Sequence, residues 1–401
     1  MSLNDRPMSE RLHIAFFGLR NAGKSSVVNA VTGQKLSLVS DIKGTTTDPV
    51  TKAMEILPLG PVVIIDTPGI DDEGELGKMR VKRAKDILSK TDIAILVVDA
   101  AKGLQAQDQE LIKAFRARNI PFIEVFNKSD LLESVPNSVE NRIYVSAEKN
   151  SNIWELKELI GKLADKAESD RKIIGDLVSP DDIVILVTPI DESAPKGRMI
   201  LPQVQTIRDV LDNNALNLVV KETGLEAALK SLAKPPRMVV TDSQAFGKVS
   251  KIVPEDIPLT SFSILFARYK GELRELVRGA AALDRLCDGD RILISEGCTH
   301  HRQCNDIGTV KLPGWVRGYT KKELSFEYTS GNEFPDDLTE YALVIHCGGC
   351  MLNEREMKSR IRRAADAGVL MTNYGTAIAK MHGILRRSLE LFPDALAELD
   401  K

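Results

Sequence analysis

Residues able to bind metal or carry out redox chemistry cluster in two short segments late in the chain of 401 residues. In EGCTHHRQC they are Cys298, His300, His301 and Cys304, and in HCGGC they are His346, Cys347 and Cys350. The chain holds only five cysteines, so four of them fall in these segments. The first question is therefore which chemistry thiols and imidazoles at this spacing support.

The residue types leave several chemistries open. A dithiol couple at Cys347-x-x-Cys350 would precede a helix that lowers a thiol pKa, but it leaves Cys298 and His300 without a role. Zinc fits tetrahedral ligation by Cys298, His300, Cys347 and Cys350. An iron–sulfur cluster fits the three cysteines with a fourth position open or weakly held. The C-x-x-x-C-x-x-C triplet of radical-SAM enzymes is absent.

Both segments follow predicted strands. RILIS (291–295) leads into the first and ALVI (342–345) into the second, while VLMT (369–372) leads into Asn373 and Tyr374. Ligands of an open parallel α/β sheet gather outside the carboxyl ends of its strands. We therefore expect these segments to meet at one edge of a sheet.

A phosphate-binding loop lies near the other end of the chain. GLRNAGKSS fits G-x-x-x-x-G-K-[ST] from Gly18 to Ser25, after the strand HIAFFG and before the helical stretch SVVNAVTG. Its backbone would wrap the phosphates, Lys24 would reach the β/γ-phosphates and Ser25 would bind Mg²⁺. The nucleotide-binding residues predicted here are Gly18, Asn21, Ala22, Gly23, Lys24, Ser25 and Ser26.

Two companion motifs follow in the order of a GTPase. In DTPG (66–69), Asp66 would hold Mg²⁺ through water and Gly69 would donate its N–H to the γ-phosphate. In DIKGTTTD (41–48), Thr45 or Thr46 would complete the Mg²⁺ shell as a switch residue, and we assign the ligand role to Thr46.

Two further loops predict guanine recognition. In NKSD (127–130), the Asp130 carboxylate would accept from the guanine ring N1–H and amine, while Lys128 packs along the base. Asn127 and, in SAE (146–148), Ser146 and Ala147 complete the set, with the Ala147 N–H meeting the guanine oxygen. Four motifs in the correct order, each after a strand, predict GTP binding.

These motifs resemble the TrmE–Era–EngA group of GTPases over about Arg11 to Ala164. The resemblance implies that Asn21 and the loop SDIKGTTTD help hold K⁺. Residue 70 is Ile, so the water-positioning Gln of Ras-type GTPases is missing. Slow hydrolysis, stimulated by K⁺, is therefore expected.

The chain as a whole resembles the FeFe-hydrogenase maturation GTPases of the HydF family. The resemblance depends on an N-terminal GTPase followed by CTH and, after 45 intervening residues, HCGGC. The stretches at 188–212 and 261–273 also look like that family. It implies a 4Fe-4S cluster on Cys298, Cys347 and Cys350. His300 and His346 would lie near the cluster or supply its fourth ligand, whereas Cys304 falls outside the family pattern.

The same resemblance implies the function. A scaffold or carrier would receive a diiron precursor from two radical-SAM maturases and deliver it to the apo FeFe-hydrogenase. The nucleotide state, GTP or GDP, would bias partner exchange by ordering the switch segments around Thr45 and Asp66. The middle domain would make the protein a homodimer or a higher oligomer.

Alternating strands and helices predict an α/β protein throughout. We expect a P-loop GTPase domain at 1–172, a dimerisation domain at 176–260, and a parallel-sheet cluster domain at 261–401. The stretch FSILFARYK (262–270) is counted among the strands of this alternation. Helices are expected in LPQVQTIRDVLDNN, GELRELVRGAAALDRL and NEREMKSRIRRAADAG.

Composition narrows the class of protein. A net charge of −3 and a pI near 6.1 argue against a nucleic-acid partner. No apolar run approaches the roughly 18–20 residues of a membrane helix and no signal peptide is apparent, so we expect a cytoplasmic protein with reduced thiols. Cys287 is expected in the core, and the basic run SRIRRAADAG on a solvated helix face.

Two other classes remain as alternatives. A GTPase associated with RNA or the ribosome would need a basic or K-homology-like tail, and none is visible. A zinc-stabilised switch GTPase would bind one zinc in place of iron.

Overall fold

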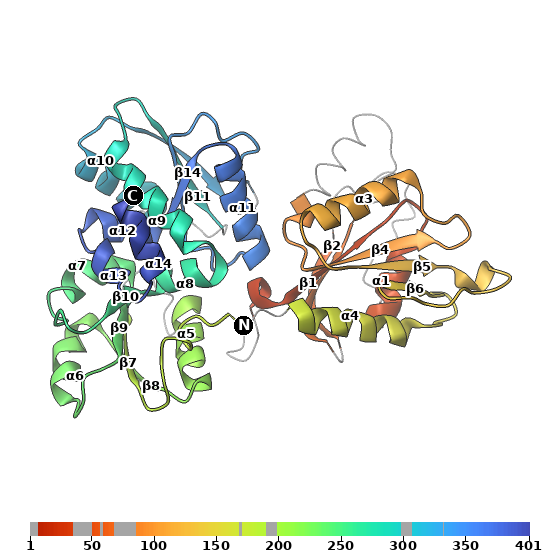
Figure 1. The fold of residues 1–401 in the computed structure, drawn as a ribbon, viewed down its shortest axis with the longest axis horizontal. Helices are drawn as coiled ribbons and strands as arrows, with labels where there is room; N and C mark the ends of the chain where they lie inside the picture. Colours follow the sequence, from red (N-terminus) through yellow and green to blue (C-terminus); the bar gives the residue numbers. More distant parts are fainter. Residues whose placement is uncertain are drawn as a thin grey trace. The chain divides into compact units, whose positions relative to one another are not determined.

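The computed structural model describes residues 7–34, 50–56, 59–67, 86–167, 171–189, 199–297, 307–331 and 333–401. Two compact units make up the chain, Met1–Asp170 and Arg171–Lys401. Both are α/β, as the sequence predicts, and Figure 1 labels most of their elements.

The first unit is built on a sheet in the order β2-β3-β1-β4-β5-β6, parallel except for the β2–β3 pair. Its strands are β1 (Leu12–Phe17), β2 (Val50–Ile56), β3 (Gly60–Asp66), β4 (Ile93–Asp99), β5 (Phe122–Asn127) and β6 (Arg142–Tyr144). Its helices are α1 (Lys24–Thr32), α3 (Ala106–Ala117) and α4 (Ile153–Ala167).

Helices cover both faces of this sheet because its central strands are apolar on both sides. In β1, Ile14 and Phe16 pack with α1 and α4, while Ala15 and Phe17 pack with Phe115 of α3. Burial on both faces is typical of a parallel sheet wound with helices. The strands therefore end at one edge, where the nucleotide motifs begin.

The second unit contains two parallel four-stranded sheets, β10-β9-β7-β8 and β12-β11-β13-β14. The first sheet consists of β7 (Ile183–Val187), β8 (Leu216–Val220), β9 (Met238–Thr241) and β10 (Leu259–Ser261). The second consists of β11 (Arg291–Glu296), β12 (Ser325–Ser330), β13 (Leu343–His346) and β14 (Leu370–Asn373). The helices are α5 (Leu201–Asp212), α6 (Leu225–Ser231), α7 (Phe246–Val249), α8 (Phe262–Lys270), α9 (Leu273–Ala281), α10 (Leu312–Thr320), α11 (Glu354–Asp366), α12 (Tyr374–Met381), α13 (Leu385–Ser388) and α14 (Pro393–Leu396).

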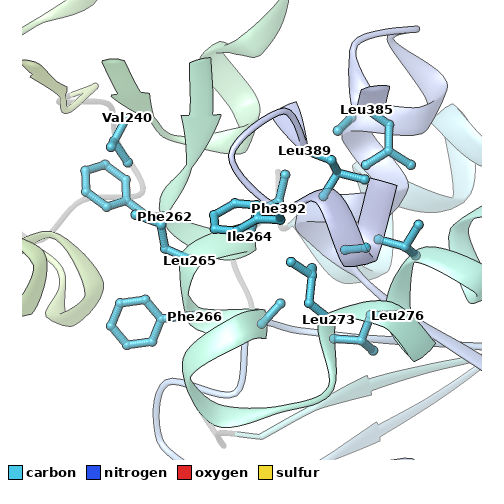
Figure 2. Close-up of a cluster of buried hydrophobic side chains, with 14 of the residues drawn as sticks. Val240, Phe262, Ile264, Leu265, Phe266, Leu273, Leu276, Leu385, Leu389 and Phe392 are labelled. Atoms are coloured by element: carbon cyan, nitrogen blue, oxygen red, sulfur yellow. The ribbon is translucent and has the colours of Figure 1, made fainter. Parts of the chain in front are cut away.

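One hydrophobic core joins these two sheets. It includes Val240 of the first sheet, Leu293 and Val344 of the second, and side chains of α8 and α9. Figure 2 shows Phe262, Leu265 and Phe266 of α8 together with Leu273 and Leu276 of α9 and Leu389 and Phe392 of the C-terminal segment. The opposite face of the second sheet packs on α10 and α12 through a separate cluster.

The prediction of a strand at 262–270 is wrong, because this segment is helix α8. The Ser261 hydroxyl caps the helix by accepting from the Ile264 N–H at 3.2 Å. The segment lies between two sheets, and Phe262 and the run from Ile264 to Ala267 are all buried. Burial on nearly every side removes the helical period from the sequence, which makes a short apolar run ambiguous. The three expected helices are confirmed as α5, α9 and α11.

None of the helices in the described ranges combines the length and apolar character needed to cross a membrane.

Candidate functional site

The phosphate loop connects β1 to α1 and depends on two glycines. Gly18 has φ +147°, and a Cβ there would lie 2.2 Å from the Val97 carbonyl oxygen. Gly23 has φ +85°, and a Cβ there would lie 2.3 Å from the Asn127 Nδ2. Only glycine fits both the left-handed backbone and the close approach. The helix α1 then begins at Lys24, so its N-terminus faces the loop, as an anion site requires.

The cation and hydroxyl of the motif are held ready beside this loop. The buried Lys24 donates to the Gly18 and Leu19 carbonyls at 3.0 and 3.3 Å. The Ser25 hydroxyl donates to Asp66 Oδ2 at 3.0 Å. Both groups thus lie at the loop whose backbone N–H groups are expected to bind phosphate.

Asp66 has the character of a ligand for a divalent cation. Burial raises its pKa, against the opposing effects of the Ser25 hydrogen bond and the Lys24 charge. Its Oδ1 atom is buried and has no hydrogen-bond partner in the described part of the chain. A buried carboxylate oxygen without a partner is costly, and hard oxygen donors are those that Mg²⁺ prefers. Ser25 and Asp66 therefore fit the ion.

The guanine loops are tied to the phosphate loop by Asn127 and Lys128. The buried Asn127 amide donates to the Ala22 carbonyl and accepts from the Ala147 N–H, both at 3.1 Å. The Lys128 ammonium donates to the Asn21 carbonyl at 2.8 Å and to Asp99 Oδ2 at 2.7 Å. The two loops thus form one bonded assembly at the carboxyl edge of the sheet.

The Asp130 carboxylate, which is predicted to bind guanine, is only partly buried at this edge. A hydrogen bond from Ser146 lowers the pKa of Asp130, so the group is an anion at neutral pH. Ser146 also accepts from the Lys149 N–H at 3.1 Å, which fixes the loop. The structure thus brings together the residues predicted from the first and last motifs. Ser26 is exposed at the start of α1. Thr45, Thr46 and Gly69 lie outside the described residues.

In the second unit the HCGGC segment begins at the carboxyl end of β13, next to β11. Ser295 of β11 pairs with His346 of β13, and the Cys347 N–H donates to the Ser295 carbonyl at 2.9 Å. The Cys347 sulfur accepts from the Gly297 N–H at 3.1 Å and from the Gly349 N–H at 3.4 Å. The strand ends therefore meet, as their direction predicts, with a sulfur at the junction.

The remainder of the segment forms a tight turn before α11. Gly349 has φ +63° and its carbonyl accepts from the Leu352 N–H at 3.0 Å. Asn353 then caps α11 by accepting from the Glu356 N–H at 2.9 Å. No disulfide joins Cys347 to Cys350. Burial raises the pKa of the Cys350 thiol, and the charge of Lys270 acts in the opposite direction.

His346 is fully buried and both of its ring nitrogens are hydrogen-bonded. Nε2 lies 3.0 Å from Arg360 Nη1, and Nδ1 lies 2.8 Å from the Cys347 carbonyl oxygen. A guanidinium only donates, so Nε2 is the acceptor and Nδ1 carries the proton. Burial, followed by the charge of Arg360, lowers the pKa of His346 to about 3. His346 thus lies beside the cysteines as predicted, but a role as fourth ligand would require it to release Arg360 or the Cys347 carbonyl.

Arg360 shows that the prediction of a solvated basic face is wrong at one position. Its side chain is 4% exposed and bridges His346, Glu356 Oε1 at 2.8 Å and the Gly331 carbonyl at 2.6 Å. Helical spacing places Arg360 on the same face of α11 as the buried Met357 and Ile361. The prediction relied on the charge of the run and not on this spacing. Arg362 of the same run is exposed, as expected.

Lys270 is a second residue that the sequence did not single out. This final residue of α8 is 2% exposed, and its ammonium donates to the carbonyls of Cys350 and Leu352 at 3.1 and 3.0 Å. No spacing rule links it to a cysteine 80 residues away. Only the tertiary structure brings the two together.

Several predicted residues are not placed beside these groups. Cys298, His300 and Cys304 lie outside the described residues. Cys287 is exposed, so its expected place in the core is wrong. It lies in the turn before β11, where its N–H donates to Asp290 Oδ2 at 2.8 Å.

Known family models match consecutive parts of the chain. Residues 13–128 match the model described as 50S ribosome-binding GTPase. Residues 173–271 match the hydrogen maturase F dimerization domain, and residues 274–391 match the hydrogen maturase F tetramerization domain. The first unit is thus a GTPase domain, and the matched parts of the second are oligomerisation domains.

Individual relatives match the GTPase part. GTPase Der of Kosmotoga olearia is 37% identical over 178 residues, which are 40% of this chain and 40% of that protein. The tRNA modification GTPase MnmE of Nitrosospira multiformis is 34% identical over 158 residues, 38% of this chain and 34% of that protein. The chain thus spans less than half the length of these relatives. A structure of Aquifex aeolicus Era is 18% identical with a TM-score of 0.34 over 88% of this chain and 97% of that one, too low to support an argument about the fold.

The family follows from the two maturase models. They occupy consecutive parts of the second unit, in the order expected behind a GTPase domain, and together they span more than half of the chain. The chain therefore belongs to the hydrogen maturase F (HydF) family.

Proposed function

We propose that this protein is a GTP-hydrolysing scaffold that binds a 4Fe-4S cluster and delivers a diiron precursor to an apo FeFe-hydrogenase. The proposal combines the family with the geometry of the two sites. The nucleotide site supplies a switch, and the cysteine segment supplies thiolates at the carboxyl edge of a parallel sheet.

The observation that carries the proposal is the contact between Gly297 and Cys347. Gly297 donates its N–H to the Cys347 sulfur at 3.1 Å, and the next residue in the chain is Cys298. The segment predicted to supply the third thiolate thus begins, in the sequence, directly after the residue that contacts Cys347. N–H groups that donate to sulfur also stabilise cluster thiolates. Cys298, Cys347 and Cys350 together suit a cluster with three protein ligands.

Three thiolates would leave one iron for an exchangeable ligand. Such a site retains the cluster while it holds its cargo weakly enough to release it. Two radical-SAM maturases would supply the diiron precursor, and the hydrogenase would receive it. His300 and His346 would lie near that exchangeable position, and the fourth ligand stays an open part of the proposal.

The GTPase domain would regulate these transfers. Ser25, Asp66 and Thr46 would surround Mg²⁺, which neutralises phosphate charge when bound. Asn21 would help hold K⁺ and thereby stimulate a slow hydrolysis. Lys24 and Gly69 would distinguish GTP from GDP at the γ-phosphate, and the guanine loops would bind the base of either nucleotide. The two states would differ in their contacts to partners.

An edge strand offers a route to a homo-oligomer. In the sheet β10-β9-β7-β8, strand β8 lies at the edge with Leu216 and Val219 51% and 41% exposed. Leu211 of the preceding helix is 55% exposed. An apolar edge strand is a template for pairing with a second chain. We therefore propose that β8 lies in the dimer interface of the dimerization domain.

Anaerobic purification with iron, sulfide and zinc analysis tests the cluster. The intact protein should carry about four iron atoms per chain, and Cys347→Ser and Cys350→Ser should each lower the iron content. Cys287→Ser is the matched control, because this exposed thiol lies in a separate turn. A colourless protein with one zinc would contradict the proposal.

A second variant tests whether the two sites are separable. Lys24→Ala should abolish GTP turnover and leave the iron content unchanged. Loss of iron together with turnover would argue against independent modules.

A further inference from the structure

A buried lysine binds the turn formed by Cys347 to Cys350, which is called the cysteine turn below. Lys270 ends α8, and its ammonium donates to the carbonyls of Cys350 and Leu352. Lysine is almost never fully buried unless its charge is satisfied. A side chain with 2% exposure at this position therefore indicates a specific requirement for an ammonium donor near the cysteines.

Backbone hydrogen bonds also shape the turn, from the Cys347 N–H to the Ser295 carbonyl and from the Leu352 N–H to the Gly349 carbonyl. Two of its four residues from Cys347 to Cys350 are glycines, and Gly349 has a left-handed φ. Glycine leaves a chain the largest number of accessible conformations. The two carbonyls that Lys270 binds flank Met351, so one ammonium fixes the exit from the turn.

The same contact reaches the first cysteine segment. Leu352 packs closely on Gly297, because a Cβ built on Gly297 would lie only 2.7 Å from the Leu352 Cγ. Gly297 in turn donates to the Cys347 sulfur. Lys270 therefore holds a small assembly made of Leu352, Gly297 and the turn, which carries Cys347 and Cys350.

We propose that Lys270 is a positioning residue for the cluster, which presets the cysteine turn and places a positive charge beside it. The inference rests on the proposed cluster function. The first consequence concerns the metal-free protein, where the ammonium holds the turn in its binding conformation. The second concerns the loaded protein, where a nearby positive charge favours the form with one more electron.

The experiment compares Lys270→Arg, Lys270→Gln and Lys270→Met in the full chain. Arginine keeps the charge and its donors, glutamine keeps a donor without the charge, and methionine keeps neither. Lys380→Met is the matched control, since Lys380 is a half-buried lysine of the same unit that pairs with Asp284. Circular dichroism confirms that each variant is folded.

Amide hydrogen exchange of the metal-free protein tests the first consequence. Peptides covering 347–352 should exchange at least tenfold faster in Lys270→Met and close to the wild-type rate in Lys270→Arg. Unchanged exchange in Lys270→Met would overturn the proposal. This result does not depend on iron, so a wild-type protein that takes up no cluster would refute the proposed function and leave this measurement decisive.

A potentiometric titration of the reconstituted cluster tests the second consequence. Dithionite supplies one electron to the cluster, and the midpoint potential is followed by electron paramagnetic resonance. Lys270→Gln and Lys270→Met should lower the reduced-to-oxidised ratio at a fixed potential at least tenfold, which is about 59 mV for a one-electron couple. Lys270→Arg and Lys380→Met should stay near the wild type. The charge effect would be refuted if the midpoint potential changed only in variants whose turn exchanges faster, whether or not the charge is kept. Lys270 would then have a structural role alone.

Discussion

Replacing Arg360 by Met should destabilise the second unit more than any surface change on the same helix. Arg360 and Glu356 have side-chain exposures of 4% and 9%, and their ion pair is 2.8 Å long. Removal of the guanidinium leaves a buried carboxylate, the His346 Nε2 and the Gly331 carbonyl without their donor. Breaking one side of a buried ion pair costs about 3 to 5 kcal/mol.

The expected shift in melting temperature follows from this free energy. A domain of 150–250 residues, a range that includes this unit, loses about 2–4 °C per kcal/mol. Arg360→Met should therefore lower the melting transition of the second unit by about 6 to 20 °C. Differential scanning calorimetry of the metal-free protein under reducing conditions measures it, with the exposed Arg362→Met as control.

A double variant separates the ion pair from its surroundings. Arg360→Met combined with Glu356→Met removes both charges, and it should be more stable than Arg360→Met alone because the buried carboxylate that loses its ion pair is removed as well. We expect a coupling free energy of about 1 to 3 kcal/mol. Two results would contradict this prediction. Arg360→Met could melt within about 2 °C of the Arg362→Met control, which corresponds to the low end of the shift per kcal/mol. The double variant could also be less stable than Arg360→Met.

Three further predictions follow from separate parts of the molecule. Asp130→Asn removes the carboxylate that would accept hydrogen bonds from guanine. GTP affinity in a binding titration should fall about 10- to 100-fold, as expected for a charged hydrogen bond of about 1.5–3 kcal/mol. An unchanged affinity would exclude Asp130 from base recognition. Leu216→Lys places a charge on the exposed edge strand β8, so sedimentation should show a dimer at least about tenfold weaker, or 1.4 kcal/mol, with an unchanged melting temperature; an unaltered dimer would place the interface elsewhere. Hydrogen bonds from Arg278, Lys401 and Arg274 lower the pKa of Glu398 to about 2, below the unfolded value of about 4.3, so its stabilisation is complete above that unfolded value and is lost as the pH falls toward 2. Glu398→Gln should therefore flatten the loss of melting temperature between about pH 5 and pH 3, and an identical pH profile would show that this carboxylate is not linked to folding.

Local signals in the sequence were sufficient for the nucleotide site. The phosphate loop is short, and its glycines, lysine and serine all fall within the eight residues from Gly18 to Ser25, so the covalent order nearly defines the geometry. Asn127 and Asp130 could be predicted because they follow an apolar strand that ends at the sheet edge. The convergence of RILIS and ALVI was also predictable, since parallel strands bring their carboxyl ends together.

The predictions that failed concern segments whose burial or partners differ from what their residue types usually indicate. Phe262–Lys270 resembles a strand because α8 packs in the core that joins the two sheets and six of its nine residues are buried. Arg360 resembles a surface cation because its partners, His346 and the Gly331 carbonyl, are 14 and 29 residues away. Strand β12 was not predicted, because its run SFEYTS is mostly polar and none of its positions is buried.

The sequence by itself determined the α/β class, the GTP-binding motifs and the approach of the two cysteine segments, because each depends on neighbours in the chain or on strand direction. Only the tertiary structure decided which buried cations, Lys270 and Arg360, hold the cysteine turn and its histidine. Those contacts form when α8 and α11 pack against the sheet, and the packing follows from apolar burial that no local motif records.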